Sequence, residues 1–197
     1  MNQPEILFNP KVLEKGAKIV KEVNKEVAGI MGINAAARTT CVKPSGNASV
    51  LLQTASGIHA EHSDMYIRNV QMNKESEITQ AIVKSNPYMV EESVWSASGT
   101  DVVVSFPIIP HKGSILKDEL LGVTHLEKVK LAQKHWVVAG TNEELCADKG
   151  IRHNVSNTII VDDWDEVEEY VFKNRNSFAG ISFLSMSGDK DYNQAPN

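Results

Sequence analysis

The sequence predicts an α/β protein in which strands alternate with helices, pair mostly in parallel, and are covered by the helices. Segments with the three- and four-residue spacing of amphipathic helices alternate with short runs rich in β-branched residues. With 197 residues, of which 42% are hydrophobic and 23% charged, the chain is long enough to bury a core. These observations exclude a disordered chain and a small disulfide scaffold, and we expect one α/β domain over residues 1–197.

The first predicted element is an amphipathic helix that starts after Asn9 and stops at Gly32. A capping residue followed by proline at the first helical position is a typical start, and apolar residues then recur at helical spacing. A short strand is expected over Thr39–Lys43, because the run contains β-formers and ends before a proline. A helix is expected to follow over Ala48–Gln53.

The middle of the chain predicts a strand, a helix and a hairpin. Met65–Met72 alternates β-formers with polar residues, and Asn73–Ser85 has early acidic residues and apolar positions at helical spacing. The β-rich runs Tyr88–Trp95 and Asp101–Ile109 are separated by five small residues. We expect these two runs to form a hairpin at a sheet edge.

The last third begins with a capping box, Thr124-x-x-Glu127, that is expected to open a helix closed by Gly140. A strand over Val155–Val161, a helix with an acidic first turn over Asp163–Asn174, and a strand over Gly180–Met186 complete the prediction.

Charge and hydropathy limit the possible partners. The net charge is −5, but residues 1–60 carry seven Lys/Arg against four Asp/Glu, so this third is the part suited to an anionic ligand. No basic block interleaved with aromatic residues is present, and we expect no DNA or RNA partner. The sequence shows neither a signal peptide nor an apolar run of about 20 residues. We therefore expect a soluble, cytoplasmic protein without a membrane partner.

The most informative stretch is a loop of small residues between the predicted strand and the helix that follows it. Backbone N–H groups and two serine hydroxyls in such a loop can bind a phosphate, because small side chains let its oxygens approach the backbone. An ordinary strand-to-helix turn is the alternative, and the spacing of a Walker loop is absent. The candidate residues are Pro44, Ser45, Gly46, Asn47, Ala48 and Ser49.

Other chemistry-bearing residues give weaker patterns. His59 and His62 flank Glu61 at a spacing that a metal could use, but no third ligand is signalled, so we expect no metal site. Cys41 and Cys146 are too far apart for a disulfide framework or a zinc site, and we interpret both as structural. No catalytic residue is assigned, since neither a Ser/His/Asp pattern nor a dinucleotide fingerprint is present.

Several sequence blocks, taken together and in order, carry a family resemblance. The leading blocks are Cys41-Val42-Lys43-Pro44-Ser45-Gly46, Gly57-Ile58-His59 and Tyr66-Ile67-Arg68-Asn69-Val70; later blocks are Val102–Pro107, His135–Val137, His153–Thr158, Gly180–Leu184 and Tyr192–Pro196. In their order and spacing the sequence resembles the adenosylcobalamin-dependent (class II) ribonucleoside-triphosphate reductases over nearly its whole length.

This resemblance implies the C-terminal part of the reductase catalytic domain, as a partial segment of its ten-stranded α/β barrel. The family is an oxidoreductase that uses a cobalt-containing vitamin B12 cofactor and a cysteine thiyl radical to make deoxyribonucleotides for DNA replication. Its loop for substrate phosphate matches Pro44–Ser49, although the family usually has Thr where this chain has Asn47. Its radical cysteine and reducing cysteines match nothing here, so neither role passes to Cys41 or Cys146.

Two hypotheses follow. In the first, the chain supplies the phosphate loop and barrel scaffold for a ribonucleoside triphosphate substrate. It is then inactive without the missing N-terminal part of the reductase and does not hold adenosylcobalamin tightly by itself. In the second, it is a non-catalytic α/β module that binds a nucleotide or a partner. A partial barrel would leave open sheet edges, through which we expect homo-oligomers to form.

Overall fold

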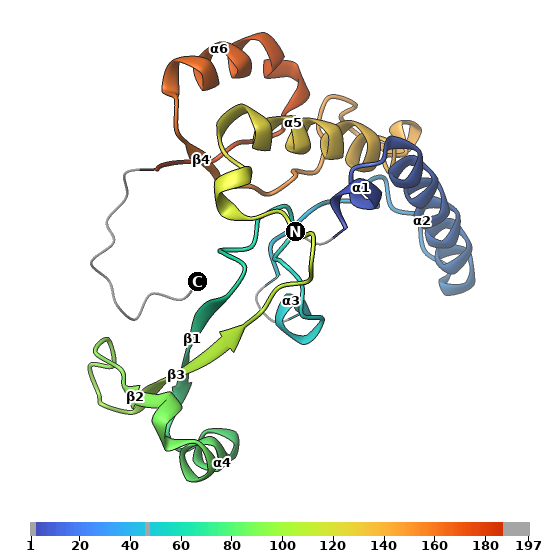
Figure 1. Ribbon diagram of the computed structural model, residues 1–197. Helices are drawn as coiled ribbons and strands as arrows, with labels where there is room; N and C mark the ends of the chain where they lie inside the picture. Colours follow the sequence, from blue (N-terminus) through green and yellow to red (C-terminus); the bar gives the residue numbers. More distant parts are fainter. Residues whose placement is uncertain (1–2, 46–47, 187–197) are drawn as a thin grey trace. The chain divides into compact units, whose positions relative to one another are not determined.

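The structure, a computed structural model, describes residues 3–45 and 48–186 (Figure 1). Its elements form two compact units. Within the described residues, the first unit contains residues up to Glu61 together with 111–186, and the second contains 62–110. The expectation of a single domain over residues 1–197 remains a prediction. No helix in the described part of the chain has the length and apolar character needed to cross a bilayer.

The first unit begins with two helices, α1 (Pro4–Leu7) and α2 (Pro10–Met31). The Asn9 side chain caps α2 by accepting a hydrogen bond from the Lys11 N–H at 3.0 Å. At the other end, Gly32 has a φ of 68°, a left-handed conformation that favours glycine. Both predicted ends of this helix are confirmed.

The predicted strand Thr39–Lys43 does not form. Within the stretch, the structure describes one isolated bridge, between Val42 and Val155, and Arg38 just before it bridges Thr141. Side chains, rather than a continuous neighbouring strand, contact two of its carbonyls, those of Thr40 and Cys41. A β-forming run therefore remains irregular here, because a strand needs a partner of similar length.

The helix α3 (Ala48–Leu51) is two residues shorter than the predicted Ala48–Gln53. Gln53 has a φ of 51°, which is left-handed and cannot continue an α-helix. The Thr54 N–H instead donates to the Ser49 carbonyl at 2.9 Å, the closing bond of a Schellman turn.

The central helix of the first unit is α5 (Gly122–Ala132), which continues directly into a π-helical segment, η3 (Gln133–Val138). The predicted capping box is wrong, because α5 begins two residues before Thr124 and the N-cap residue is Leu121, which makes no side-chain capping bond. Two 3-10 turns flank these helices, η2 (Lys117–Glu119) and η4 (Glu143–Leu145).

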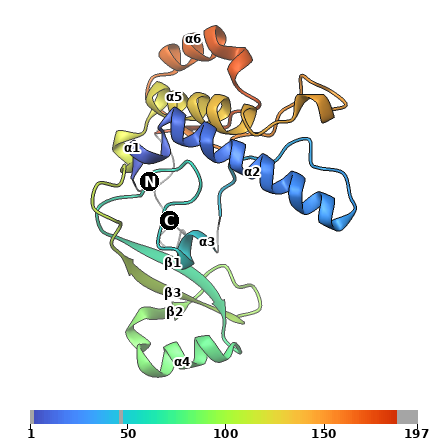
Figure 2. The same cartoon turned by 90° about the vertical axis from the view of Figure 1, so that its right-hand side faces the viewer.

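The first unit ends with β4 (Ile159–Val161), α6 (Trp164–Asn174), the 3-10 turn η5 (Arg175–Ser177) and β5 (Phe183–Ser185). The strands β4 and β5 pair in parallel, as expected. Asp163 caps α6 by accepting hydrogen bonds from two backbone N–H groups. Helices α5 and α6 lie side by side in both views (Figures 1 and 2). The apolar core of this unit includes Leu126, Val129, Val137, Val155, Ile159, Val161 and Val167.

The second unit is a three-stranded antiparallel sheet with strand order β1-β3-β2 and a helix. Its elements are β1 (Tyr66–Asn73), α4 (Glu77–Ser85), the 3-10 turn η1 (Pro87–Met89), β2 (Val90–Glu92) and β3 (Asp101–Ile108). The predicted hairpin is confirmed, and β2 lies at the edge of the sheet. Parallel pairing is wrong for this unit, because both strand pairs are antiparallel. For β2 and β3 the short link permits no other arrangement.

The α/β class is therefore confirmed. The described strands form small sheets of three and two members, and the ten-stranded barrel remains a prediction.

Candidate functional site

The chain entering the candidate phosphate loop is held by side chains from distant parts of the first unit. The Thr40 hydroxyl donates to the Trp136 carbonyl at 2.7 Å, and the Trp136 indole N–H donates to the Cys41 carbonyl at 3.0 Å. His153 Nδ1 lies 3.1 Å from the Thr40 carbonyl oxygen. At Gly140 a Cβ atom would lie 2.0 Å from Thr40 Oγ1, so only glycine fits there. These contacts fix the direction in which the chain enters the loop.

Within the loop, Ser45 is the centre of a hydrogen-bond network. Its hydroxyl oxygen accepts from the N–H groups of Ala48 and Ser49 at 3.1 and 3.3 Å. The Ser49 hydroxyl donates to the Ser45 carbonyl. Pro44 is exposed at the start of the loop, and the predicted residues Gly46 and Asn47 lie outside the described residues. The structure thus brings together both serine hydroxyls and two of the backbone donors expected at this site.

One residue of the network, Ser56, was missed by the sequence analysis. Its hydroxyl oxygen accepts from the Ser45 N–H at 2.7 Å and lies 3.2 Å from the Ser45 carbonyl oxygen, to which it donates. Ser56 lies eleven residues after Ser45, a spacing that no sequence motif for phosphate loops includes. The signal that could have found it is the adjacent Gly57, which has a φ of 59° and indicates a tight turn.

Behind this turn, two histidines contact backbone carbonyls. His59 Nδ1 lies 2.9 Å from the Ser56 carbonyl oxygen, and His125 Nε2 lies 2.9 Å from the Ile58 carbonyl oxygen. Burial lowers the pKa of His125 from 6.5 to about 4, so it is neutral at pH 7 and donates through Nε2. The two rings meet edge to face with their centroids 6.1 Å apart. These histidines support the turn next to the loop.

The other sequence candidates are the histidines on either side of Glu61 and the two cysteines. No group of three His, Cys, Asp or Glu side chains in the described part of the chain could hold a metal ion. Cys41 is exposed, whereas Cys146 is buried with its sulfur 3.4 Å from the Asn142 carbonyl oxygen. Neither thiol forms a disulfide.

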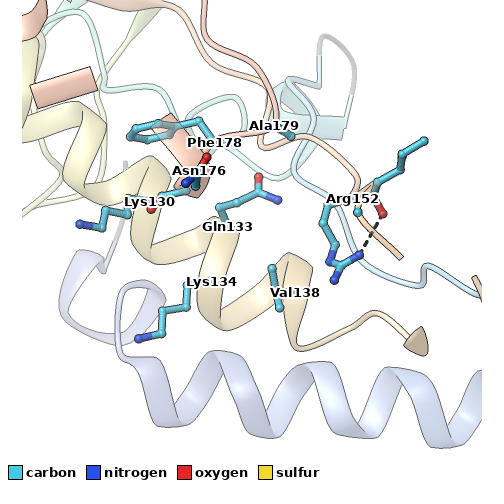
Figure 3. A pocket seen from close by; sticks show the side chains of 11 residues that line it. Lys130, Gln133, Lys134, Val138, Arg152, Asn176, Phe178 and Ala179 are labelled. Atoms are coloured by element: carbon cyan, nitrogen blue, oxygen red, sulfur yellow. Dashed lines mark hydrogen bonds between the residues drawn. The ribbon is translucent and has the colours of Figure 1, made fainter. Parts of the chain in front are cut away.

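A cavity of about 530 Å³ lies elsewhere in the first unit (Figure 3). Lys130, Lys134 and Arg152 line it, and no carboxylate does. Arg152 forms an ion pair with Glu143 outside the cavity, and the amino ends of both lysines point away from Arg152 (Figure 3). The three positive charges therefore do not converge on one position for an anion.

Weak binding of adenosylcobalamin by this chain alone remains a prediction. A ligand of that size needs a cleft that encloses it on several sides, and three cavities described in the first unit measure about 410, 530 and 690 Å³.

The fold defines a segment of an α/β protein, and the comparison with a known structure agrees with this class. The crystal structure of a B12-dependent (class II) ribonucleotide reductase superposes with a TM-score of 0.73. The match covers 95% of this chain and 24% of the reductase chain at 20% sequence identity. No family model matches the sequence.

Curated relatives specify the resemblance further. The chain is 30% identical over 121 residues to a probable adenosylcobalamin-dependent ribonucleoside-triphosphate reductase of Dictyostelium discoideum, a match that covers 61% of this chain and 16% of the relative. It is 23% identical over 124 residues to the adenosylcobalamin-dependent ribonucleoside-triphosphate reductase of Euglena gracilis, which covers 63% of this chain and 17% of the relative. The resemblance indicated by the sequence blocks is confirmed: the chain is similar to a segment of these reductases and spans about a sixth of their length.

Proposed function

We propose that the chain is a part of a cobalamin-dependent ribonucleoside-triphosphate reductase that contributes barrel scaffold and the loop for substrate phosphate. The 30% identity over 121 residues to a reductase carries the proposal, because the name of that relative states the activity. The similarity of fold supports the scaffold role.

The hydrogen bonds of the loop support a phosphate contact. Ser45 Oγ lies 3.1 and 3.3 Å from two successive backbone nitrogens, at the long end of N–H···O distances. It occupies the position that a phosphate oxygen would take if the serine side chain rotated away. The α3 helix has four residues and adds little dipole, so the contacts come from the N–H groups and hydroxyls. The exposed Lys43 adds a positive charge next to the loop.

The remaining chemistry belongs to other parts of the reductase in this proposal. Thiyl chemistry in the family needs three cysteines in one pocket, and this chain has two. Cys146 is buried against backbone carbonyls, and Cys41 is exposed. The chain alone is inactive and requires the N-terminal part of the reductase as its partner.

Amide chemical shifts of the full chain, measured while a ribonucleoside triphosphate is added, test the loop. Ser45, Ala48 and Ser49 should shift, and Gly46→Val should weaken binding because a branched side chain crowds the approaching phosphate. Shifts confined to other residues, or unchanged binding by Gly46→Val, would contradict the loop assignment.

An activity assay tests the second half of the proposal. The chain with adenosylcobalamin and a dithiol should form no deoxynucleotide. Deoxynucleotide formation that is lost in a Cys41→Ser, Cys146→Ser double variant would show that the chain is an enzyme by itself.

A further inference from the structure

We propose that Ser56 is a positioning residue that holds the Ser45 peptide in the geometry needed to bind phosphate. The inference rests on the proposed phosphate-binding function of the loop and adds a residue outside the six-residue stretch. Ser56 would act through Ser45 rather than by contact with the phosphate.

The Ser56 hydroxyl binds the Ser45 residue at both of its backbone polar groups. It accepts from the N–H at 2.7 Å and donates to the carbonyl oxygen, which lies 3.2 Å away. A single hydroxyl can satisfy both bonds, since it has one proton and two lone pairs. Both backbone polar groups of Ser45 are therefore held by one side chain, which fixes the Cα atom from which the Ser45 side chain projects and leaves its hydroxyl free to rotate.

Ser56 is itself held in place by its neighbours. Its carbonyl oxygen accepts from the His59 backbone N–H at 3.2 Å and from the His59 ring at 2.9 Å. At Gly57, a Cβ atom would lie 3.0 Å from the Lys43 carbonyl oxygen, so the turn packs directly on the backbone that precedes the loop. A hydroxyl on such a supported turn loses little further freedom when it bonds to Ser45.

The consequence for binding concerns the two nitrogens at which the phosphate would arrive. The N–H groups of Ala48 and Ser49 both point to Ser45 Oγ. If the Ser45 backbone rotated, its hydroxyl could no longer hold these two N–H groups in one direction before phosphate arrives, and they would have to be reoriented on binding. The cost of that ordering would appear as weaker affinity.

Titration calorimetry with inorganic triphosphate and, separately, a ribonucleoside triphosphate tests the role in the full chain. We expect Ser56→Ala to lower the affinity for both ligands by the same factor, about tenfold, because the lost contacts act on the phosphate subsite. Ser56→Thr keeps the hydroxyl and should restore most of the affinity. Ser85→Ala, which removes a hydroxyl bonded within α4 in the second unit, is the matched control and should leave affinity unchanged.

Hydrogen exchange of the Ser45 amide separates positioning from a general loss of stability. Ser56→Ala should speed exchange at Ser45 while amides of the core, such as Val129, keep their protection. If Ser56→Ala lowers the thermal midpoint but binds both ligands as tightly as the wild type, the positioning role is wrong and the phosphate loop stands. If the wild-type chain binds neither ligand, the phosphate-loop proposal fails and the positioning role fails with it.

Discussion

Replacement of Gly57 by alanine should destabilise the first unit through two separate effects. The residue has a φ of 59°, where an L side chain costs about 1 to 2 kcal/mol. The added Cβ would also lie 3.0 Å from the Lys43 carbonyl oxygen and 3.2 Å from the Pro44 nitrogen. These are backbone atoms that cannot rotate away, and such overpacking typically costs about 1 to 3 kcal/mol. We expect the free energy of unfolding to fall by about 2 to 5 kcal/mol in total.

Gly113 provides a matched control for the crowding. It lies in the same unit with a φ of 83°, and no atom lies within 4 Å of the position its Cβ would take. Gly113→Ala should therefore show only the conformational cost, about 1 to 2 kcal/mol. Gly29 lies inside α2 with open space around it. Gly29→Ala should therefore raise the free energy of unfolding by about 0.5 to 1 kcal/mol.

Equilibrium urea unfolding followed by tryptophan fluorescence measures these differences. Trp136 and Trp164 belong to the first unit and Trp95 to the second, so a Trp95→Phe background makes the signal report on the first unit alone. If Gly57→Ala and Gly113→Ala lower the free energy of unfolding equally, the turn at Gly57 does not pack on the Lys43–Pro44 backbone. The same result would remove one support of the Ser56 arrangement.

Three further predictions concern pH, a helix end and association. His125 has a pKa of about 4 in the folded chain and 6.5 in the unfolded chain, so the unfolded state binds more protons between these two pH values. The free energy of unfolding should therefore fall by about 3 kcal/mol as the pH drops from 6.5 to 4. Urea midpoints of the His125→Gln variant, measured over the same pH range, should lack this part of the loss. Gln53→Gly should raise the thermal midpoint, because glycine adopts the left-handed conformation of this position without the strain of about 1 kcal/mol that a side chain adds. An unchanged or lower midpoint would contradict this strain. Sedimentation should show a dimer or larger species formed through open sheet edges, and a strict monomer would count against the partial barrel.

The parts of the fold that the sequence could predict are those set by local chemistry. Asn9 followed by proline and Gly32 at the end define α2, and α6 begins one residue after the predicted start at Asp163, which caps it. The hairpin was predictable too, because a short link of small residues joins two β-forming runs. In each case the determining atoms lie within a few residues of one another.

The errors arose where distant contacts decide the structure. Thr39–Lys43 has β-forming residues, but contacts from Trp136 and His153 replace the continuous strand that would have paired with it. Thr124 and Glu127 have capping-box spacing, yet the helix starts earlier at Gly122. Parallel pairing, inferred from the alternation of elements, holds for β4 and β5 and fails in the second unit.

The candidate site shows the same division between local and distant information. Ser45 and Ser49 were found because they lie in one short stretch, whereas Ser56 joins them only when the turn at Gly57 folds back on Lys43. The loop is then held on one side by this turn and, at its entry, by the π-helical segment η3 through Trp136. π-helical insertions occur often at functional sites, because they offset the side chains that follow them.

This arrangement links the affinity of the loop to the folding of the whole first unit. The Trp136 contact to the Cys41 carbonyl comes from a residue 95 positions away, and the His153 contact to the Thr40 carbonyl from one 113 positions away. A peptide limited to residues 38–61 would keep the serines and the turn but lose both supports. Because a flexible loop has to be ordered when a ligand binds, such a peptide should bind triphosphate more weakly than the full chain. Equal affinity of the peptide and the chain would show that the entry contacts do not prepare the loop for phosphate.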